Sequence, residues 1–220
     1  KEKALEIIKV CEENSIFYSV YTENAIISKS LNYNVLVYYS ENANKEENKK
    51  TNINIVENVY EYIDKINTKN ILKINVCDSN KIIFEGMLRK IREISDINLL
   101  EISNMTRRVV KNGTEEFVLE YFYTEISNEN VNKWTAIQKL SGILQIEEKD
   151  IIAIGDNIND KMMVENAGTG IVMGNGSLAL QTKKGNIVSD NNQNGVAEGI
   201  EKYYLRYCKN ITGILQKNDI

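Results

Sequence analysis

Hydrophobic and polar positions follow one pattern in the first half of the chain and another in the second. In the first half, segments with helical apolar spacing are mixed with segments rich in β-branched and aromatic residues. The patterns predict helices at 3–11, 55–64 and 80–94, strands at 15–22, 71–77, 98–110 and 115–124, and a polar loop at 40–52. We therefore expect an α+β module, a mixed sheet with helices on one face. The last two strands are expected to join in a hairpin at residues 111–114, because Asn-Gly tolerates the positive φ of such turns.

From residue 132 onward, short and continuously apolar strands are separated by helices. The pattern predicts helices at 132–144, 160–167, 178–184 and 196–208, and strands at 151–155, 170–173 and 187–189. Such strands are typical of a parallel sheet that is covered on both faces. The expected domains are therefore 1–126, of α+β type, and 127–220, part of a doubly wound α/β domain. Three strands make a thin sheet, and residue 1 is a lysine, so we expect further strands of this domain before residue 1.

Composition excludes several kinds of chemistry. The 220 residues include no histidine, so the chain cannot supply a Ser-His-Asp triad or a His-ligated zinc. A net charge of −4 gives no electrostatic reason to expect nucleic-acid binding. Cys11, Cys77 and Cys208 are far apart and are expected to be free thiols in a reducing compartment. With no apolar run long enough for a membrane helix and no signal-peptide pattern, we expect a cytoplasmic protein without a membrane partner.

The strongest candidate site follows the predicted strand at 151–155. Asp156 comes directly after Gly155, and Asn159 and Asp160 stand at the start of the next helix. The carboxyl ends of strands in open α/β sheets face the ligand crevice. Two carboxylates four residues apart across this turn can converge on a hard cation such as Mg2+, and the amide can donate to an anionic oxygen. The alternative is that Asn159 or Asp160 only caps the helix.

Lys133 is the second candidate, at the start of the preceding helix. A lysine is unfavourable at a helix N-terminus, so its position favours a nearby anion such as phosphate, although a solvated side chain is the alternative. The glycines between Gly168 and Gly176 predict tight turns, and they lack the GxGxxG and P-loop spacings.

Together these residues resemble a known family. The run from Val131 to Ile200 contains Asn132-Lys133, the GDxxND sequence at residues 155–160, Met163, and further matching segments at residues 166–168, 172–175 and 194–197. It is similar to the C-terminal portion of the haloacid dehalogenase (HAD) superfamily, specifically the Cof-like phosphatases with a large α/β cap of the C2 type. The resemblance implies a Rossmann-like core, present here in its C-terminal half, and residues 1–126 resemble the cap only in layout.

The resemblance implies roles for four residues. Lys133 matches the lysine that holds the substrate phosphoryl group, and Asn159 matches an asparagine that contacts phosphate. Asp156 matches the Mg2+ ligand, and Asp160 matches the second acidic residue, which acts in the metal shell or as an orienting catalytic partner. The family's nucleophile is the first Asp of a DxD motif, which this sequence lacks. We therefore expect it upstream of residue 1, and expect these 220 residues alone to be inactive.

The implied function is a Mg2+-dependent phosphatase that acts on a small phosphorylated metabolite such as a sugar phosphate. One alternative is a non-catalytic module, a pseudo-phosphatase that binds a phosphorylated ligand or a partner. The other is a phosphomutase of the same superfamily. The sequence specifies neither the substrate nor whether the protein is a monomer or a dimer.

Overall fold

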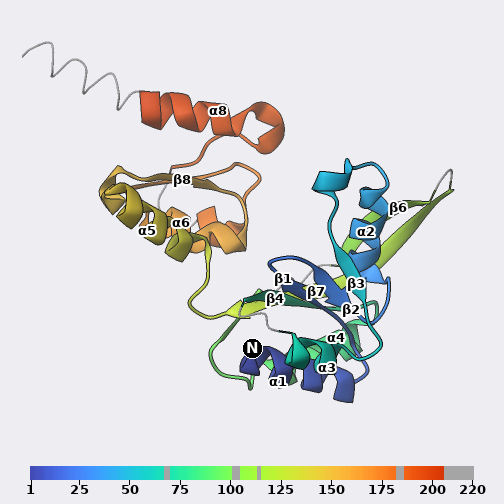
Figure 1. Cartoon of the computed structure of the whole chain (residues 1–220). Helices are drawn as coiled ribbons and strands as arrows, with labels where there is room; N and C mark the ends of the chain where they lie inside the picture. The colour runs from blue at the N-terminus through green and yellow to red at the C-terminus, as the bar shows by residue number, and fades with distance from the viewer. Residues whose placement is uncertain (67–69, 101–104, 113–114, 182–185, 206–220) are drawn as a thin grey trace, which may run out of the picture. The chain divides into compact units, whose positions relative to one another are not determined.

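The computed structural model describes residues 1–66, 70–100, 105–112, 115–181 and 186–205. It divides into two compact units, Lys1–Asn130 and Val131–Ile220 (Figure 1). The predicted turn at Gly113 and Thr114, the third cysteine Cys208 and the ends of two predicted helices lie outside the described residues. The predicted boundary at 126/127 falls inside a strand that continues to Asn128.

The first unit is built on a seven-stranded mixed sheet. Its strands are β1 (Phe17–Thr22), β2 (Ile26–Ser28), β3 (Ile53–Ile55), β4 (Ile71–Asp78), β5 (Ile97–Leu100), β6 (Thr106–Asn112) and β7 (Glu115–Asn128). The order is β3-β2-β1-β4-β7-β5, and β6 also pairs with β7. Among the strand pairs that the structure describes in this sheet, only β2–β3 is parallel. The mixed sheet that the sequence predicts is thus confirmed.

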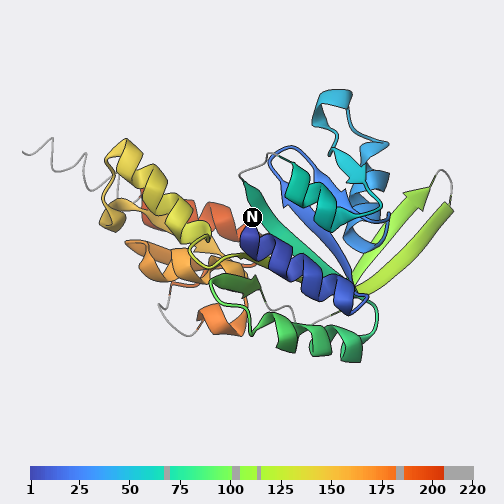
Figure 2. The same cartoon turned by 60° about the horizontal axis from the view of Figure 1, so that its bottom comes forward.

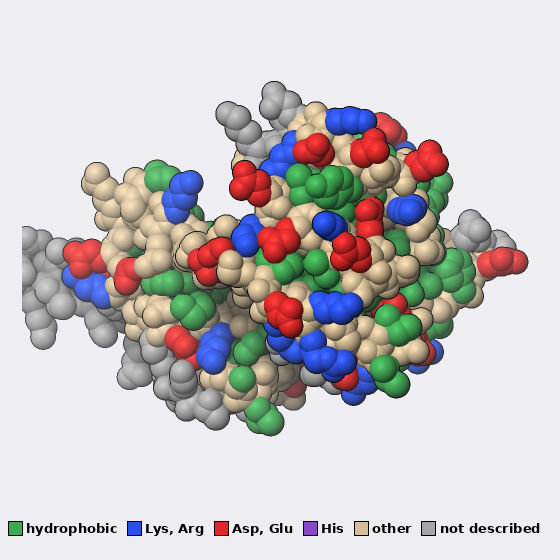
Figure 3. Space-filling view, turned by 90° about the horizontal axis from the view of Figure 1, so that it is seen from below, with side chains coloured by type: hydrophobic (Ala, Val, Ile, Leu, Met, Phe, Trp, Pro, Cys, Tyr) green, Lys and Arg blue, Asp and Glu red, His purple; other side chains and the backbone are tan. Residues whose placement is uncertain are grey.

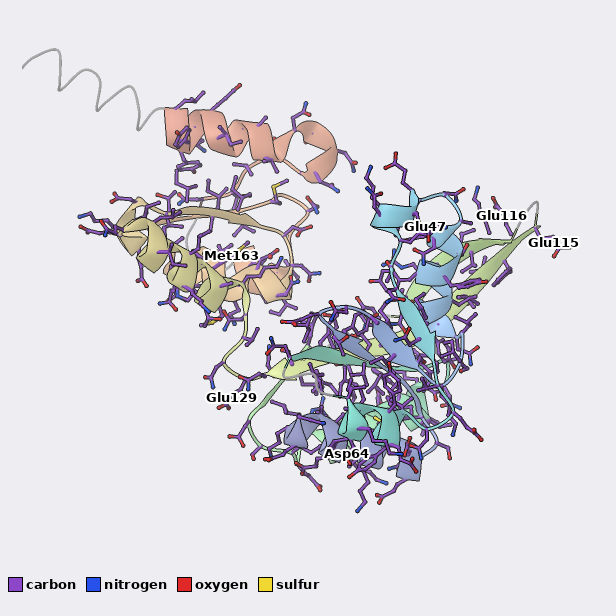
Figure 4. All side chains as sticks on the ribbon, in the orientation of Figure 1. Glu47, Asp64, Glu115, Glu116, Glu129 and Met163 are labelled. Atoms are coloured by element: carbon purple, nitrogen blue, oxygen red, sulfur yellow. The ribbon has the colours of Figure 1, made fainter. Side chains whose placement is uncertain are left out.

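The single strand predicted at 98–110 is wrong, because two strands occupy this segment. β5 pairs with the C-terminal part of β7, with Leu99 opposite Ile126. β6 pairs with the N-terminal part, with Val109 opposite Val118. β7 is 14 residues long, so its two ends can pair with two different strands, β6 and β5. The labelled Glu115 and Glu116 mark the tip of the β6–β7 ribbon (Figure 4).

Three helices cover one face of this sheet: α1 (Glu2–Glu13), α3 (Val59–Lys65) and α4 (Lys81–Ile91) (Figure 2). Their apolar sides and the facing strand residues form the main core, whose fully buried members include Ile8, Val20, Ile63, Val76 and Ile91. On the outer surface of these helices, acidic and basic side chains are interspersed (Figure 3).

The prediction that helices cover only one face is wrong. Helix α2 (Tyr33–Asn42) lies on the opposite face, where Asn34 donates hydrogen bonds to the hydroxyls of Ser19 (3.1 Å) and Tyr21 (2.7 Å). Apolar contacts hold this helix too, because Val35 is fully buried and the Tyr33 ring packs against aromatic rings of the sheet. The predicted polar loop at 40–52 also begins inside α2 and contains a 3-10 turn at Glu47–Lys49.

The second unit is a small parallel α/β arrangement. Its elements are α5 (Lys133–Leu144), β8 (Ile152–Gly155), α6 (Lys161–Asn166), β9 (Thr169–Val172), α7 (Leu178–Gln181) and α8 (Gly195–Gly199), which continues as a π-helix at Ile200–Leu205. β8 and β9 are parallel, with Ile154 opposite Ile171. The third strand predicted at 187–189 is only a single bridge from Val172 to Ile187, where the Val172 backbone hydrogen-bonds with residues 186 and 188.

Both faces of the β8–β9 pair are covered. Trp134, Ala153 and Ala167 pack together on the side of α5 and α6, where the labelled Met163 also lies (Figure 4). Ile171, Met173 and Val188 pack on the other side with Tyr203 of the π-helix. Helix α6 approaches β9 so closely that a Cβ at Gly170 would lie 1.8 Å from the carbonyl oxygen of Val164.

Two further observations concern the described residues as a whole. Cys11 and Cys77 are free and fully buried, and burial raises the pKa of both thiols. The prediction of free thiols is confirmed for these two. None of the helices described is both long and apolar enough to cross a membrane.

Candidate functional site

The candidate site lies where the end of β8 meets the start of α5. Helix α5 begins with a capping box: the Asn132 side chain accepts a hydrogen bond from the Thr135 N–H, and the Thr135 hydroxyl accepts one from the Asn132 N–H, both at 3.0 Å. This reciprocal cap fixes the first turn and makes Lys133 the first helical residue. This cap was not predicted from the sequence, although the Asn-x-x-Thr spacing could have indicated it.

Lys133 reaches across to the turn after β8. Its Nζ forms an ion pair with Oδ1 of Asp160 at 2.5 Å. The Asp160 side chain is only 5% exposed, whereas that of Lys133 is 52% exposed. The lysine therefore compensates the charge of a buried carboxylate and still presents part of its surface to solvent.

The other oxygen of Asp160 organises the turn itself. Oδ2 accepts hydrogen bonds from the backbone N–H groups of Asp156 (3.0 Å) and Asn157 (3.1 Å). The Asn157 side chain is the N-cap of the 3-10 turn that follows, and it forms a capping box with Asp160. The alternative that Asp160 caps the following helix is wrong: Asp160 is the N-cap residue of α6, but its side chain makes no capping hydrogen bond there and acts in the preceding 3-10 turn instead.

Gly155 makes room for this arrangement. A Cβ on this residue would lie 2.4 Å from Cβ of Asp160 and 3.0 Å from a methyl group of Val164. Only glycine lets the end of β8 approach the aspartate this closely. Packing against Asp160 therefore explains why the first residue of the GDxxND motif is glycine.

The surroundings of Asp160 favour its ionised form. Burial alone would raise its pKa, but the hydrogen bonds from Lys133 and from the Asn157 and Asp156 N–H groups outweigh burial and lower the pKa below its ordinary value. An aspartate with a lowered pKa stabilises the folded state above its unfolded pKa, about 3.9, and loses this contribution as the pH falls through the folded value.

This leads to a prediction for pH dependence. The difference in unfolding free energy between the wild type and Asp160→Asn is expected to be largest near neutral pH and to shrink as the pH falls below about 4. Urea unfolding of both proteins at a series of pH values measures the difference. A difference that stays constant from pH 7 to pH 2 would show that Asp160 does not contribute through its charge.

Asp156 and Asn159 occupy the exposed part of the same turn. Both residues are exposed, and within the described part of the chain no hydrogen bond or ion pair is found for the Asp156 carboxylate. The Asp156 carbonyl accepts a hydrogen bond from Ser177 N–H at 2.8 Å, which brings the loop after β9 to the same edge of the sheet. The structure thus joins Lys133 directly to Asp160 and places Asp156 and Asn159 in the turn beside them.

The turn can contribute to a Mg2+ site but does not complete one. Among the described residues, no group of three or more Asp, Glu, His or Cys side chains could hold a metal ion. Mg2+ commonly takes only one or two carboxylates from the protein, with water and phosphate oxygens as its other ligands. The exposed carboxylate of Asp156 fits such a partial set. Both oxygens of Asp160 already accept hydrogen bonds, so metal binding by Asp160 stays a prediction.

Fold and site together define an α/β protein with a cationic and an acidic side chain at the carboxyl end of a parallel strand. The sequence profile of haloacid dehalogenase-like hydrolases matches residues 1–200. The chain therefore belongs to the haloacid dehalogenase-like hydrolase family.

Individual relatives agree with this assignment. The 5-amino-6-(5-phospho-D-ribitylamino)uracil phosphatase YitU of Bacillus subtilis is 36% identical over 80 residues, which cover 36% of this chain and 30% of the relative. The phosphoglycolate phosphatase of Methanosarcina mazei is 34% identical over 92 residues, covering 40% of this chain and 41% of the relative. This chain thus spans less than half the length of these relatives.

Two solved structures share the fold. A haloacid dehalogenase-like hydrolase from B. subtilis superimposes with a TM-score of 0.66 at 20% identity, covering 92% of this chain and 70% of the other. The sugar phosphatase BT4131, of HAD subclass IIB, superimposes with a TM-score of 0.63 at 12% identity, covering 92% and 66%. These likenesses support the α/β fold class predicted from the sequence.

Proposed function

We propose that the protein is a Mg2+-dependent phosphoric monoester hydrolase. These 220 residues contribute the lysine and the carboxylates that bind the phosphoryl group and the metal ion. The observation that carries this proposal is the Lys133–Asp160 ion pair at the end of β8, beside the exposed carboxylate of Asp156. An ammonium group next to a cation-binding carboxylate suits a phosphoryl group, because both the lysine and the metal ion compensate its negative charge.

The proposed reaction is phosphoryl transfer to an aspartate. A carboxylate oxygen of that aspartate forms a bond to phosphorus while the ester P–O bond breaks, and the leaving alcohol takes a proton. Water then attacks phosphorus, which releases inorganic phosphate and restores the carboxylate. No Asp-x-Asp sequence occurs in the 220 residues, so the proposal places the nucleophile outside them.

Each candidate residue has a proposed role in this reaction. Lys133 binds the transferring phosphoryl group, and Asp160 orients Lys133 through their ion pair. Asn159 donates its amide to a phosphate oxygen. Asp156 would hold Mg2+, which when bound neutralises charge on the phosphoryl oxygens.

The proposed substrate is a small phosphorylated metabolite such as a sugar phosphate. The named activities of the relatives support this class, since all act on small phosphorylated compounds or sugars. We further propose that the first unit is a cap that selects the substrate, and that the second is part of the catalytic core. The competing proposal, a pseudo-phosphatase that binds without turnover, is favoured by the absence of Asp-x-Asp.

Ligand binding by the 220-residue chain tests this proposal. Calorimetric titration with Mg2+ is expected to show binding that Asp156→Asn weakens at least about tenfold, because the carboxylate charge is lost. Lys133→Ala is expected to weaken binding of inorganic phosphate in the same way. Asp64→Asn is the matched control, since Asp64 is an exposed aspartate on α3 of the first unit (Figure 4).

Unchanged Mg2+ and phosphate binding in the two site variants would contradict the proposed roles. The chain alone is expected not to hydrolyse p-nitrophenyl phosphate. Hydrolysis that is abolished by Lys133→Ala would contradict the placement of the nucleophile outside these residues.

A further inference from the structure

A short loop, residues 174–177, connects β9 to α7 and lies beside the turn that carries Asp156. We call it the β9–α7 loop. The Ser177 N–H donates a hydrogen bond to the Asp156 carbonyl oxygen at 2.8 Å. On the other side, the Asp156 N–H donates to Oδ2 of Asp160 at 3.0 Å. Both backbone polar groups of Asp156 are therefore hydrogen-bonded, one to the loop and one to the buried aspartate, so the backbone of Asp156 is held from two sides.

A side chain attaches this loop to the segment before α8. Oδ1 of Asn175 accepts a hydrogen bond from the Asn191 N–H at 3.0 Å, across 16 positions of sequence. The Gly174 N–H donates to the Ser189 carbonyl oxygen at 3.2 Å, in the same segment. Among the described residues, the Asn191 contact is the side-chain hydrogen bond that joins the loop to another part of the unit. Asn175 is therefore the side chain whose removal would loosen the loop.

Close packing connects this attachment to Asp156. The Gly176 N–H donates to the Met173 carbonyl oxygen at 2.8 Å, which closes a tight turn. A Cβ at Gly176 would lie 2.8 Å from that oxygen and 3.4 Å from the Asp156 carbonyl oxygen. Asn175 and Ser177 stand on either side of Gly176 in this turn. A displacement of Asn175 therefore also displaces the N–H group that binds Asp156.

The exact position of Asp156 matters because of the cation proposed to bind there. Mg2+ requires short bonds in a nearly regular octahedron, whereas Ca2+ accepts longer bonds and irregular geometry. Within the part of the chain that the structure describes, the Asp156 carboxylate has no hydrogen bond or ion pair that would hold it directly. Its position thus depends on the backbone that carries it, and a metal site needs its ligands held to within about 0.5 Å.

We propose that Asn175 is a positioning residue of the candidate site: through the β9–α7 loop, it holds the Asp156 carboxylate in the place that Mg2+ requires. The inference rests on the proposed function, because it takes Asp156 as the cation-binding carboxylate. Asn175 acts on the geometry of the site and not on its charge. Its loss therefore weakens binding of Mg2+ more than binding of Ca2+, whereas loss of the Asp156 charge weakens both.

Separate calorimetric titrations of the 220-residue chain with Mg2+ and with Ca2+ test the proposal. We expect Asn175→Ala to weaken Mg2+ binding at least about tenfold and Ca2+ binding less than about twofold. Asn175→Asp keeps an acceptor oxygen for the Asn191 N–H and is expected to restore the wild-type ratio of the two affinities. Asn58→Ala is the matched control, because Asn58 of the first unit is also an exposed asparagine whose Oδ1 accepts one backbone N–H bond at 3.0 Å.

A second measurement needs no metal ion. Amide hydrogen exchange, followed by NMR, reports whether the Ser177 N–H keeps its hydrogen bond to Asp156. We expect exchange at Ser177 to be at least about tenfold faster in Asn175→Ala than in the wild type and in Asn58→Ala. Circular dichroism and retained Ca2+ binding confirm that the Asn175→Ala variant folds.

Three results would overturn the proposal: equal weakening of Mg2+ and Ca2+ binding by Asn175→Ala, unchanged binding of both ions, or unchanged exchange at Ser177. Absence of Mg2+ binding in the wild type would contradict the proposed function and, with it, the role of Asn175. Mg2+ binding that depends on Asp156 but not on Asn175 would contradict this inference alone, so the two failures are distinguishable.

Discussion

Replacing Gly170 with alanine is expected to lower the unfolding free energy of the second unit by about 3 kcal/mol, the upper end of typical overpacking costs. The added Cβ would lie 1.8 Å from the carbonyl oxygen and 2.8 Å from the carbonyl carbon of Val164. These are backbone atoms of α6, so relief requires the whole helix to move away from β9. Urea unfolding followed by tryptophan fluorescence measures the effect, because the single tryptophan, Trp134, is buried in this unit.

Gly142→Ala is the matched control. Gly142 lies inside α5, and apart from its chain neighbours and the backbone of its own helix, a Cβ there would have no heavy atom within 4 Å. Alanine is favoured over glycine within a helix, so we expect this variant to be more stable by about 0.5–1 kcal/mol. If the two variants shift the unfolding midpoint in the same direction and by the same amount, α6 and β9 do not pack as closely as described.

Asp160→Asn is expected to lower the unfolding free energy by about 2–3 kcal/mol at neutral pH. An asparagine side chain has one acceptor oxygen, whereas Asp160 accepts from Lys133 and from two backbone N–H groups. In any orientation its amide NH2 would face another donor. The loss is expected to be smaller than for a fully buried pair, because Lys133 is half exposed and can be solvated. The same fluorescence-detected urea unfolding measures it.

Asp156→Asn provides the comparison four residues away. Because the Asp156 side chain is exposed, we expect its substitution to change stability by less than about 0.5 kcal/mol. The two aspartates of the motif would then have different roles: Asp160 is needed for stability, and Asp156 only for ligand binding. Equal losses of stability in both variants would contradict this division.

Local patterns predicted the elements that depend on apolar spacing. Helix α5 and strands β8 and β9 lie close to their expected ranges, because strong apolar runs are bounded there by Asn, Gly and Asp. The helix α2 was missed because its sequence is rich in β-branched and aromatic residues, which favour strands and do not show a helical apolar spacing. The single bridge at Ile187 could not be anticipated either, since an apolar segment does not reveal how many backbone pairs it will form.

The candidate site was predicted as a set of residues, not as an arrangement. The GDxxND spacing placed Asp156 and Asp160 after a strand, but did not reveal that one is exposed and the other buried. That difference arises from Gly155, which admits the Asp160 side chain. The ion pair joins residues 27 positions apart, a separation beyond the reach of local sequence patterns.

That ion pair also affects how strongly Lys133 can bind an anionic ligand. The ammonium group of Lys133 is already paired with the Asp160 carboxylate before an anion binds. An incoming dianion therefore competes with Asp160 for the same ammonium, and the protein gains less attraction than an unpaired lysine would give. In return, the ammonium is held at the edge of the sheet, so little side-chain freedom is lost when a ligand binds or leaves. The expected result is weak retention of free phosphate, which the proposed phosphatase reaction would require for release of its product.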